Sequence, residues 1–392
     1  MRTIQIIIII IATIILITAL VSGVLIKNAK GKGSYPYFAI LSEVLHLIDK
    51  NYVEEVNFSK IEDSIYIGLV KALGGESSFL NRDDIDYYYN PNIRGQADVG
   101  IIIGLQEGYF KIINIKKNSP ADKAGVKVGN YIYSINDEPF YRISIFRAKS
   151  LLRGEPGTTV NIKVIEQRGR KPISYDLKRE LITDSNIESK LINQDIKYLH
   201  LYNIDKINYN QLMEEVVNKE MNGIEDLIID LRGCYSEDYE AVRKAASIFL
   251  QDGAFVYGIK KKNEKITKYK AEDDGIEFKG NVYLIIDSTT AKGCEVFASA
   301  LKDNHKAYLM GTGTYGNASI QDLIFIDKDH AILLDTGLII NNANNAIQPD
   351  GINPDREYEL SAVDKIRGVI ESEDVIDWAV DIIKSRRLKK AA

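Results

Sequence analysis

A short polar turn between two apolar segments carries residue types that could do chemistry. Residues 287–295 read Asp-Ser-Thr-Thr-Ala-Lys-Gly-Cys-Glu. The run 282–286 before them is typical of a buried strand, and 296–301 after them is typical of a helix. Free N–H groups at a helix N-terminus can stabilise negative charge that develops in a reaction. The turn is therefore a candidate catalytic centre, with Lys292 near its middle.

This turn resembles the active-site turn of the C-terminal processing (tail-specific) serine peptidases. The consensus of that family runs roughly Asp-x-Gly-Ser/Thr-Ala-Ser-Ala-Ser-Glu. Asp287 and Glu295 match its two ends without a gap. In that register the nucleophilic serine of the family falls on Lys292, so the resemblance implies a site that lacks its nucleophile.

The general base is missing from a second matching segment. Residues 314–321 resemble the family's Thr-Phe-Gly-Lys-Gly-x-Val-Gln motif, with Asn317 in place of the lysine. Asn317 lies 25 residues after Lys292, which is the spacing of the family's Ser/Lys dyad. Gln321 matches the glutamine that orients the lysine in the family.

A third segment corresponds to the loop that builds the oxyanion hole. Residues 230–237 resemble the family's Asp-Leu-Arg-Asn-Asn-Pro-Gly-Gly motif, with Ser236 and Glu237 in place of the glycine pair. A carboxylate near a forming oxyanion would oppose it. The three replacements together predict a homologue that binds peptide C-termini or partner proteins without cutting them.

Two other functions remain open. An active serine-type endopeptidase could use a rewired nucleophile, either Ser288, four residues before Lys292, or Cys294, at a helix N-terminus that would lower its pKa. A structural protein could use the fold only for assembly. A peptidase assay separates the first of these from the others. A pull-down with and without the PDZ-like region separates binding from assembly.

Lys292 itself needs an explanation, because a helix dipole disfavours a cation near the N-terminus by roughly 0.3–1 kcal/mol. We expect a nearby acid to compensate. Glu237 is the first choice for this partner and Glu295 is the local alternative.

Residues 97–182 resemble a PDZ domain, with 145–152 as its groove helix. The resemblance implies strand addition, in which a peptide pairs with a strand edge and loop N–H groups hold its carboxylate. Asp98 stands where the family usually has glycine, and its charge should lower the affinity for a carboxylate. A domain that acts only as a structural lid is the alternative. The predicted peptide-binding residues are Val99, Gly100, Ile101, Ile102, Ile103, Ala148 and Leu152.

The N-terminus predicts a membrane anchor. Residues 3–26 contain no charged side chain and include an unbroken isoleucine run at 6–11. At roughly 1.5 Å per residue the segment reaches about 36 Å, enough to cross a hydrocarbon core of about 30 Å. A cleaved signal, for which 19–23 offers only a poor cleavage site, and a buried core helix are the alternatives.

Two arguments predict opposite orientations for this anchor. Arg2 precedes the segment whereas Lys27, Lys30 and Lys32 follow it, and the positive-inside rule then favours a cytoplasmic body. The family resemblance implies a body outside the cytoplasmic membrane. We follow the resemblance and predict a single-pass protein of the cell membrane with an extracytoplasmic body.

The chain is predicted to be an α+β multidomain protein with a transmembrane anchor and linker at 1–34. An N-terminal helical region at 35–96 and the PDZ-like β domain at 97–182 follow, and the polar stretch 81–97 is typical of a boundary loop. Strands and helices alternate in 183–392, which predicts α/β layers and a C-terminal helix. The resemblance, which includes the Ile-Gln-x-x-Gly-Ile-x-Pro-Asp signature at 347–355, implies a ClpP/crotonase-like peptidase fold there. We expect the basic segment 384–390 after the C-terminal helix to be a solvated tail.

Composition limits the partners. A net charge of −5 gives no support to nucleic-acid binding, and four singly scattered histidines predict no metal site or cofactor. Cys234 and Cys294 lie at the two active-site-like turns. We interpret them as incidental small residues, with a disulfide or a thiol role as the alternative. The expected partners are a peptide C-terminus or an envelope protein, with a homo-oligomer also compatible.

Overall fold

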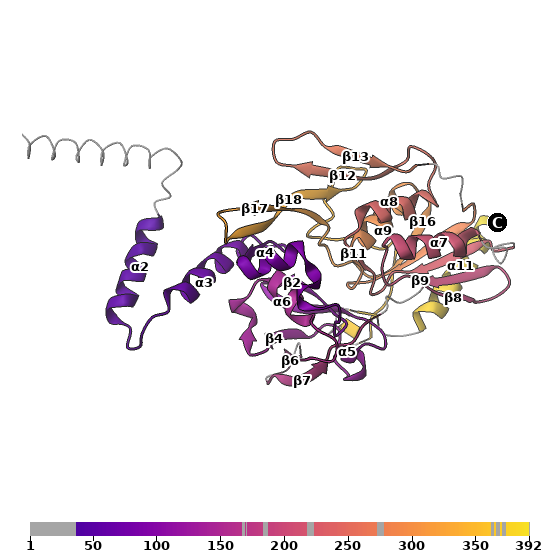
Figure 1. The fold of residues 1–392 in the computed structure, drawn as a ribbon. Helices are drawn as coiled ribbons and strands as arrows, with labels where there is room; N and C mark the ends of the chain where they lie inside the picture. Colours follow the sequence, from indigo (N-terminus) through magenta and orange to yellow (C-terminus); the bar gives the residue numbers. More distant parts are fainter. Residues whose placement is uncertain are drawn as a thin grey trace, which may run out of the picture. The chain divides into compact units, whose positions relative to one another are not determined.

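The computed structural model describes residues 37–391, apart from 167–168, 170, 183–186, 218–222, 273–277, 362–363, 366–368 and 371–373 (Figure 1). The chain divides into two compact units, 1–62 and 63–392. Helix α2 (Tyr37–Asn51) belongs to the first unit, and α3 (Phe58–Lys71) continues from the first into the second. The predicted anchor lies outside the described residues. None of the described helices combines the length and the apolarity that a membrane crossing requires.

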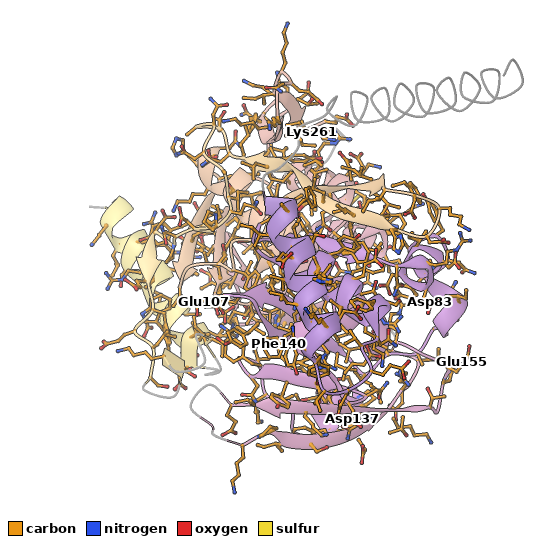
Figure 2. All side chains as sticks on the ribbon, turned by 90° about the vertical axis from the view of Figure 1, so that its left-hand side faces the viewer. Asp83, Glu107, Asp137, Phe140, Glu155 and Lys261 are labelled. Atoms are coloured by element: carbon orange, nitrogen blue, oxygen red, sulfur yellow. A yellow bond between two sulfur atoms is a disulfide. The ribbon has the colours of Figure 1, made fainter. Side chains whose placement is uncertain are left out.

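The PDZ-like region is an antiparallel sheet in the order β2-β3-β4-β6-β7, with β5 paired to β4. Alternate residues of β6, Val160 and Ile162 among them, enter its core, as expected for a strand with one buried face. Side chains such as Asp137 and Glu155 project outward from this region (Figure 2). Its elements are β2 (Ile101–Gln106), β3 (Tyr109–Ile115), α5 (Pro120–Lys123), β4 (Tyr131–Ile135), β5 (Glu138–Pro139), α6 (Ile145–Leu152), β6 (Thr159–Ile165) and β7 (Ile173–Lys178).

The peptidase-like region is built on a sheet in the order β19-β16-β14-β10-β9-β8, parallel except for β8. Its strands are β8 (Glu188–Leu191), β9 (Ile196–His200), β10 (Asp226–Asp230), β14 (Asn281–Ile286), β16 (Ala307–Gly311) and β19 (Arg356–Glu357). Its helices are α7 (Lys206–Val217), α8 (Tyr239–Ser247), α9 (Gly293–Asp303) and α11 (Asp374–Ala391).

Helices cover both faces of this sheet. Leu227 and Ile229 of β10 pack in one cluster with α7, α8 and α9, whereas Ile228 packs on the opposite face with α11. The α/β layers predicted from the sequence are therefore present. We expected a solvated basic tail at 384–390, and this holds for the exposed Lys384 and Lys389 but not for Arg387. The segment continues α11, and Arg387 Nε donates to the buried Asp226 Oδ2 at 2.6 Å.

A second sheet brings the N-terminal part of the second unit to the peptidase-like region. It contains β1 (Ser78–Leu80), β12 (Phe255–Lys261), β13 (Thr267–Lys270), β17 (Ser319–Phe325) and β18 (Ala331–Ile340). β1 pairs with β18. Immediately before β1, the Glu76 N–H and the Ser77 hydroxyl each donate to Asp335 Oδ2 at 3.1 Å. These bonds fix the backbone at Glu76.

A helix replaces the boundary loop that the polar stretch 81–97 suggested. α4 (Arg82–Tyr89) begins after Asn81, whose side chain accepts the N–H of Asp84. An Asn cap and an acidic first turn favour a helix start, and Ile85 is buried beneath it. The polar composition of this stretch suggested a loop, but the Asn81 cap and the buried face of α4 stabilise a helix.

Candidate functional site

Lys292 lies where a short strand turns into a helix. β15 (Ala291–Lys292) leads directly into α9 and pairs in parallel with β11 (Tyr235–Ser236), with Ser236 opposite Lys292. Lys292 has φ 57° and ψ −123°, a conformation that costs a residue other than glycine about 1–3 kcal/mol. In α/β-hydrolases, a strained strand-to-helix turn carries the nucleophile.

Asp287, at the start of the turn, is a buried framework residue. Its carboxylate accepts the N–H of Thr289 at 2.9 Å and the N–H of Ile370 at 3.0 Å. The Thr289 hydroxyl in turn accepts the N–H of Gly233 at 2.7 Å and so joins the oxyanion-loop motif to the turn. Burial raises the pKa of Asp287.

Glu295, at the end of the turn, ties it to the motif that would carry the base. Its fully buried carboxylate accepts the backbone N–H groups of Lys292 and Asn317 at 3.0 Å each and that of Gly316 at 2.6 Å. It also accepts the Thr314 hydroxyl at 2.6 Å. Burial raises the pKa of Glu295. Its bonds to Lys292 use the backbone and not the ammonium.

The acid that pairs with the Lys292 ammonium is Glu76. Nζ of Lys292 lies 3.2 Å from Oε2 of Glu76, and each side chain is only 4% exposed. The expectation of an acidic partner is thus confirmed, but neither Glu237 nor Glu295 is that partner. Glu76 precedes β1, far away in the sequence, and only the pairing of β1 with β18 brings it here.

A second ammonium shares this carboxylate. Nζ of Lys149, on the groove helix α6, lies 2.9 Å from Glu76 Oε2 and 3.2 Å from the hydroxyl of Tyr235. Burial by itself raises the pKa of Glu76, but the ammonium groups of Lys149 and Lys292 outweigh it and lower that pKa to about 2. Burial opposes the charge on Lys149 as well, yet Glu76 raises its pKa overall. Glu76 and Lys149 are therefore ionised at neutral pH.

Asn317, at the base position, bridges the two sides of this cluster. Its Oδ1 accepts the backbone N–H of Lys292 at 3.0 Å, and its Nδ2 donates to Glu76 Oε1 at 3.2 Å. Gln321 lines the neighbouring cavity, and its Nε2 is buried with no hydrogen-bond partner in the described part of the chain. The structure thus brings the nucleophile and base positions together around Glu76.

The two residues in place of the oxyanion-loop glycines face different surroundings. The buried Ser236 hydroxyl donates to the carbonyl of Ile204 at 2.6 Å. Glu237 is 64% exposed at the rim, accepts a hydrogen bond from the Tyr235 hydroxyl and lies 3.8 Å from Lys149 Nζ. Ser236 is thus a packing residue, whereas Glu237 adds negative charge beside the site.

The two cysteines form a disulfide, which corrects their interpretation as incidental residues. Cys234 and Cys294 are fully buried, with Cα atoms 5.9 Å apart. The bond joins the oxyanion-loop motif to the first turn of α9. Cys294 consequently has no free thiol.

A cavity of about 670 Å³ extends from this cluster into the PDZ-like groove, where Ile101, Ile102 and Ile103 line it. The other predicted peptide-binding residues, Val99, Gly100, Ala148 and Leu152, are buried. From α6, the residues facing the cavity include Ile145 and Lys149. Strand β2 lies against the base motif, since a Cβ at Gly104 would come within 2.3 Å of the Tyr315 hydroxyl. Within the described ranges, no His, Cys, Asp and Glu side chains are grouped as a metal site requires.

Comparison with known proteins agrees with this geometry. Residues 195–358 match peptidase family S41, and residues 111–166 match a PDZ domain. The chain therefore contains a peptidase family S41 domain and a PDZ domain. It is 24% identical over 358 residues to carboxy-terminal processing protease CtpA of Bacillus subtilis (strain 168), across 88% of this chain and 76% of that protein. A carboxy-terminal-processing protease of Bartonella bacilliformis is 21% identical over 341 residues, across 86% of this chain and 78% of that protein.

The S41 chain also shares its fold with a solved peptidase. Photosystem II D1 C-terminal processing protease superposes with a TM-score of 0.66 at 16% identity, over 86% of this chain and 98% of that one. The sequence motifs therefore identified the family correctly.

Two site residues of this S41 chain had no sequence signal. Lys149 lies on the predicted groove helix, but its spacing does not point toward the catalytic turn. Glu76 lies in the part of the chain predicted as the N-terminal helical region, and no periodic or motif pattern connects it with Lys292. Only tertiary structure joins them.

Proposed function

We propose that this S41 protein is a pseudopeptidase that binds peptide C-termini or partner proteins in its cavity without cleaving them. The observation that carries the proposal is the buried ion pair between Lys292, at the nucleophile position, and Glu76. An ammonium held by a carboxylate is neither a nucleophile nor a base. The cavity next to it stays open and continues into the PDZ-like groove.

The chemistry of the replaced groups supports the absence of cleavage. Lys292 has no hydroxyl to attack a carbonyl, and the amide of Asn317 cannot accept a proton from one. In subtilisin, the loss of a single triad member lowers turnover on the order of a million-fold. Both members of the dyad are replaced in this chain.

A rewired nucleophile has less support. Cys294 is in a disulfide, so a thiolate mechanism would require its reduction first. Ser288 would need a neutral lysine as its base, and the Lys292 ammonium is instead stabilised by Glu76. Neither arrangement provides an activated nucleophile.

We also propose that residues 3–26 anchor the protein in the cell membrane with its body outside the cytoplasm. The disulfide supports this orientation over the lysine count, because structural disulfides persist mainly in oxidising compartments. External protease added to intact cells should digest the body. A body that resists until the cells are lysed would contradict this orientation.

The binding half of the proposal is tested with an unstructured protein such as β-casein. Full-length protein in detergent should retain it, and Ile102→Arg, which places a charge at the cavity wall, should weaken retention at least tenfold. Tyr133→Arg, at an exposed position on β4 that does not line the cavity, is the matched control. Absence of retention in the wild type would favour a purely structural protein.

A further inference from the structure

The loop before β2 carries its own carboxylate at the place where a PDZ fold holds that of a ligand. Oδ1 of Asp98 accepts the N–H of Gly100 at 2.7 Å. The backbone of Asp98 is fixed by two hydrogen bonds with Glu180, of 2.9 and 3.1 Å. Asp98 also lines the cavity. Its side chain is therefore held inside the groove and not turned away from it.

Loops of this kind capture a terminal carboxylate with successive backbone N–H groups. In this chain the Gly100 N–H already has an anionic acceptor. A ligand carboxylate would lose that donor and would lie beside a like charge, a juxtaposition that interfaces use to reject wrong partners. Arg153 and Lys116 line the same cavity, so its wall is not uniformly acidic.

Among the described residues, one side of β2 carries no paired strand. β2 is the edge strand of its sheet, paired to β3 on one side. An extended segment can still pair along β2, because these hydrogen bonds come from the backbone and need no chain end. Asp98 thus removes the recognition of a terminus and leaves the recognition of an extended strand.

We propose that the groove selects internal extended segments of its partners over free C-termini, with Asp98 as the residue that sets this preference. This inference rests on the proposed binding function and narrows its ligand class. A partner would present a loop or a linker to β2, and its own C-terminus would lie elsewhere.

A library of random decapeptides, each made as a free acid and as a C-terminal amide, tests the inference. Full-length protein in detergent should retain amides at least tenfold better than the matching acids, as read by mass spectrometry. Asp98→Gly should shift the ratio toward acids at least tenfold. Asp98→Asn keeps the acceptor for Gly100 without the charge and should shift it by less.

The outcomes separate this inference from the proposed function. A wild-type preference for acids, or a ratio that Asp98→Gly leaves unchanged, overturns the inference and keeps peptide binding. Retention of neither form, by the wild type or by Asp98→Gly, overturns both. Thermal unfolding of each variant checks the fold, which should survive because Asp98 bonds to Glu180 only through its backbone.

Discussion

Lys292 in the strand-to-helix turn and Asp98 in the PDZ-like groove are both charged residues, but they lie in different surroundings. At the turn, Lys292 is buried and requires the carboxylate of Glu76. In the groove, Asp98 is only partly buried, accepts the N–H of Gly100 and interacts electrostatically with Arg179. A charge in a dry site needs a counter-charge, whereas a charge near water does not. The comparison shows that a charged residue introduced at a buried position requires a second residue of opposite charge, whereas one introduced near solvent does not.

The framework around the turn explains why its shape persists. Asp287 and Glu295 hold the backbone through hydrogen bonds that involve neither a nucleophile nor a base side chain. The reactive groups can therefore change while the turn stays in place.

The largest expected effect comes from removing the shared counter-charge. Glu76→Gln leaves the buried Lys292 ammonium without a carboxylate, whereas the partly exposed Lys149 keeps Glu237 at 3.8 Å. The variant should lower the free energy of unfolding by about 3–5 kcal/mol. Urea unfolding of the region from Ser34 onward measures this. Glu237→Gln is the matched control, since Glu237 is 64% exposed, and should change stability by less than about 0.5 kcal/mol. Equal effects of the two variants would contradict the burial argument.

Removing the disulfide should give the second-largest loss of unfolding free energy. Replacing both Cys234 and Cys294 by alanine removes a link between positions 60 residues apart and should cost about 2–4 kcal/mol. Denaturant unfolding under non-reducing conditions measures the difference. Two thiols that react with iodoacetamide in the unreduced, unfolded wild type would show that the bond is absent.

Lowering the pH should reduce the contribution of the Glu76 carboxylate to the free energy of unfolding. The pKa of Glu76 is about 2 in the folded protein, against an ordinary value of 4.5. This contribution to stability is present above about pH 4.5 and is lost as the pH falls toward 2. It amounts to about 3 kcal/mol. The stability difference between wild type and Glu76→Gln should shrink over that range, and a constant difference would contradict the ionised cluster.

The pairing of Lys292 gives the smallest and most specific effect. A double-mutant cycle of Lys292→Met with Glu76→Gln should give a coupling of about 1–3 kcal/mol. The same cycle with Glu237→Gln should give only a few tenths, because the ion pair is with Glu76. A larger coupling to Glu237 would restore the partner that the sequence suggested.

Local patterns predicted those parts of the molecule that depend on neighbours in the sequence. The groove helix was expected at 145–152 and α6 has these bounds. The structure also places Lys292 beside Asn317, and their assignment to the nucleophile and base positions stays a prediction. In each case the prediction depends on a pattern within a short stretch of sequence, such as a helix cap or a family motif.

What could not be predicted depends on contacts between distant segments. Glu76 reaches Lys292 only through the pairing of β1 with β18. Arg387 appeared to belong to a solvated tail because its partner Asp226 lies at the start of a distant strand. The disulfide likewise required the two turns to meet, which spacing alone does not fix.

Cleavage is the measurement that tests the central claim most directly. The region from Ser34 onward is incubated with β-casein and with peptides bearing varied C-termini, and intact-mass spectrometry follows their lengths. CtpA of Bacillus subtilis is assayed alongside. The account predicts no shortening by this chain over days, with Lys292→Ala and Ser288→Ala indistinguishable from wild type. Steady shortening that disappears in Ser288→Ala or Lys292→Ala would contradict it.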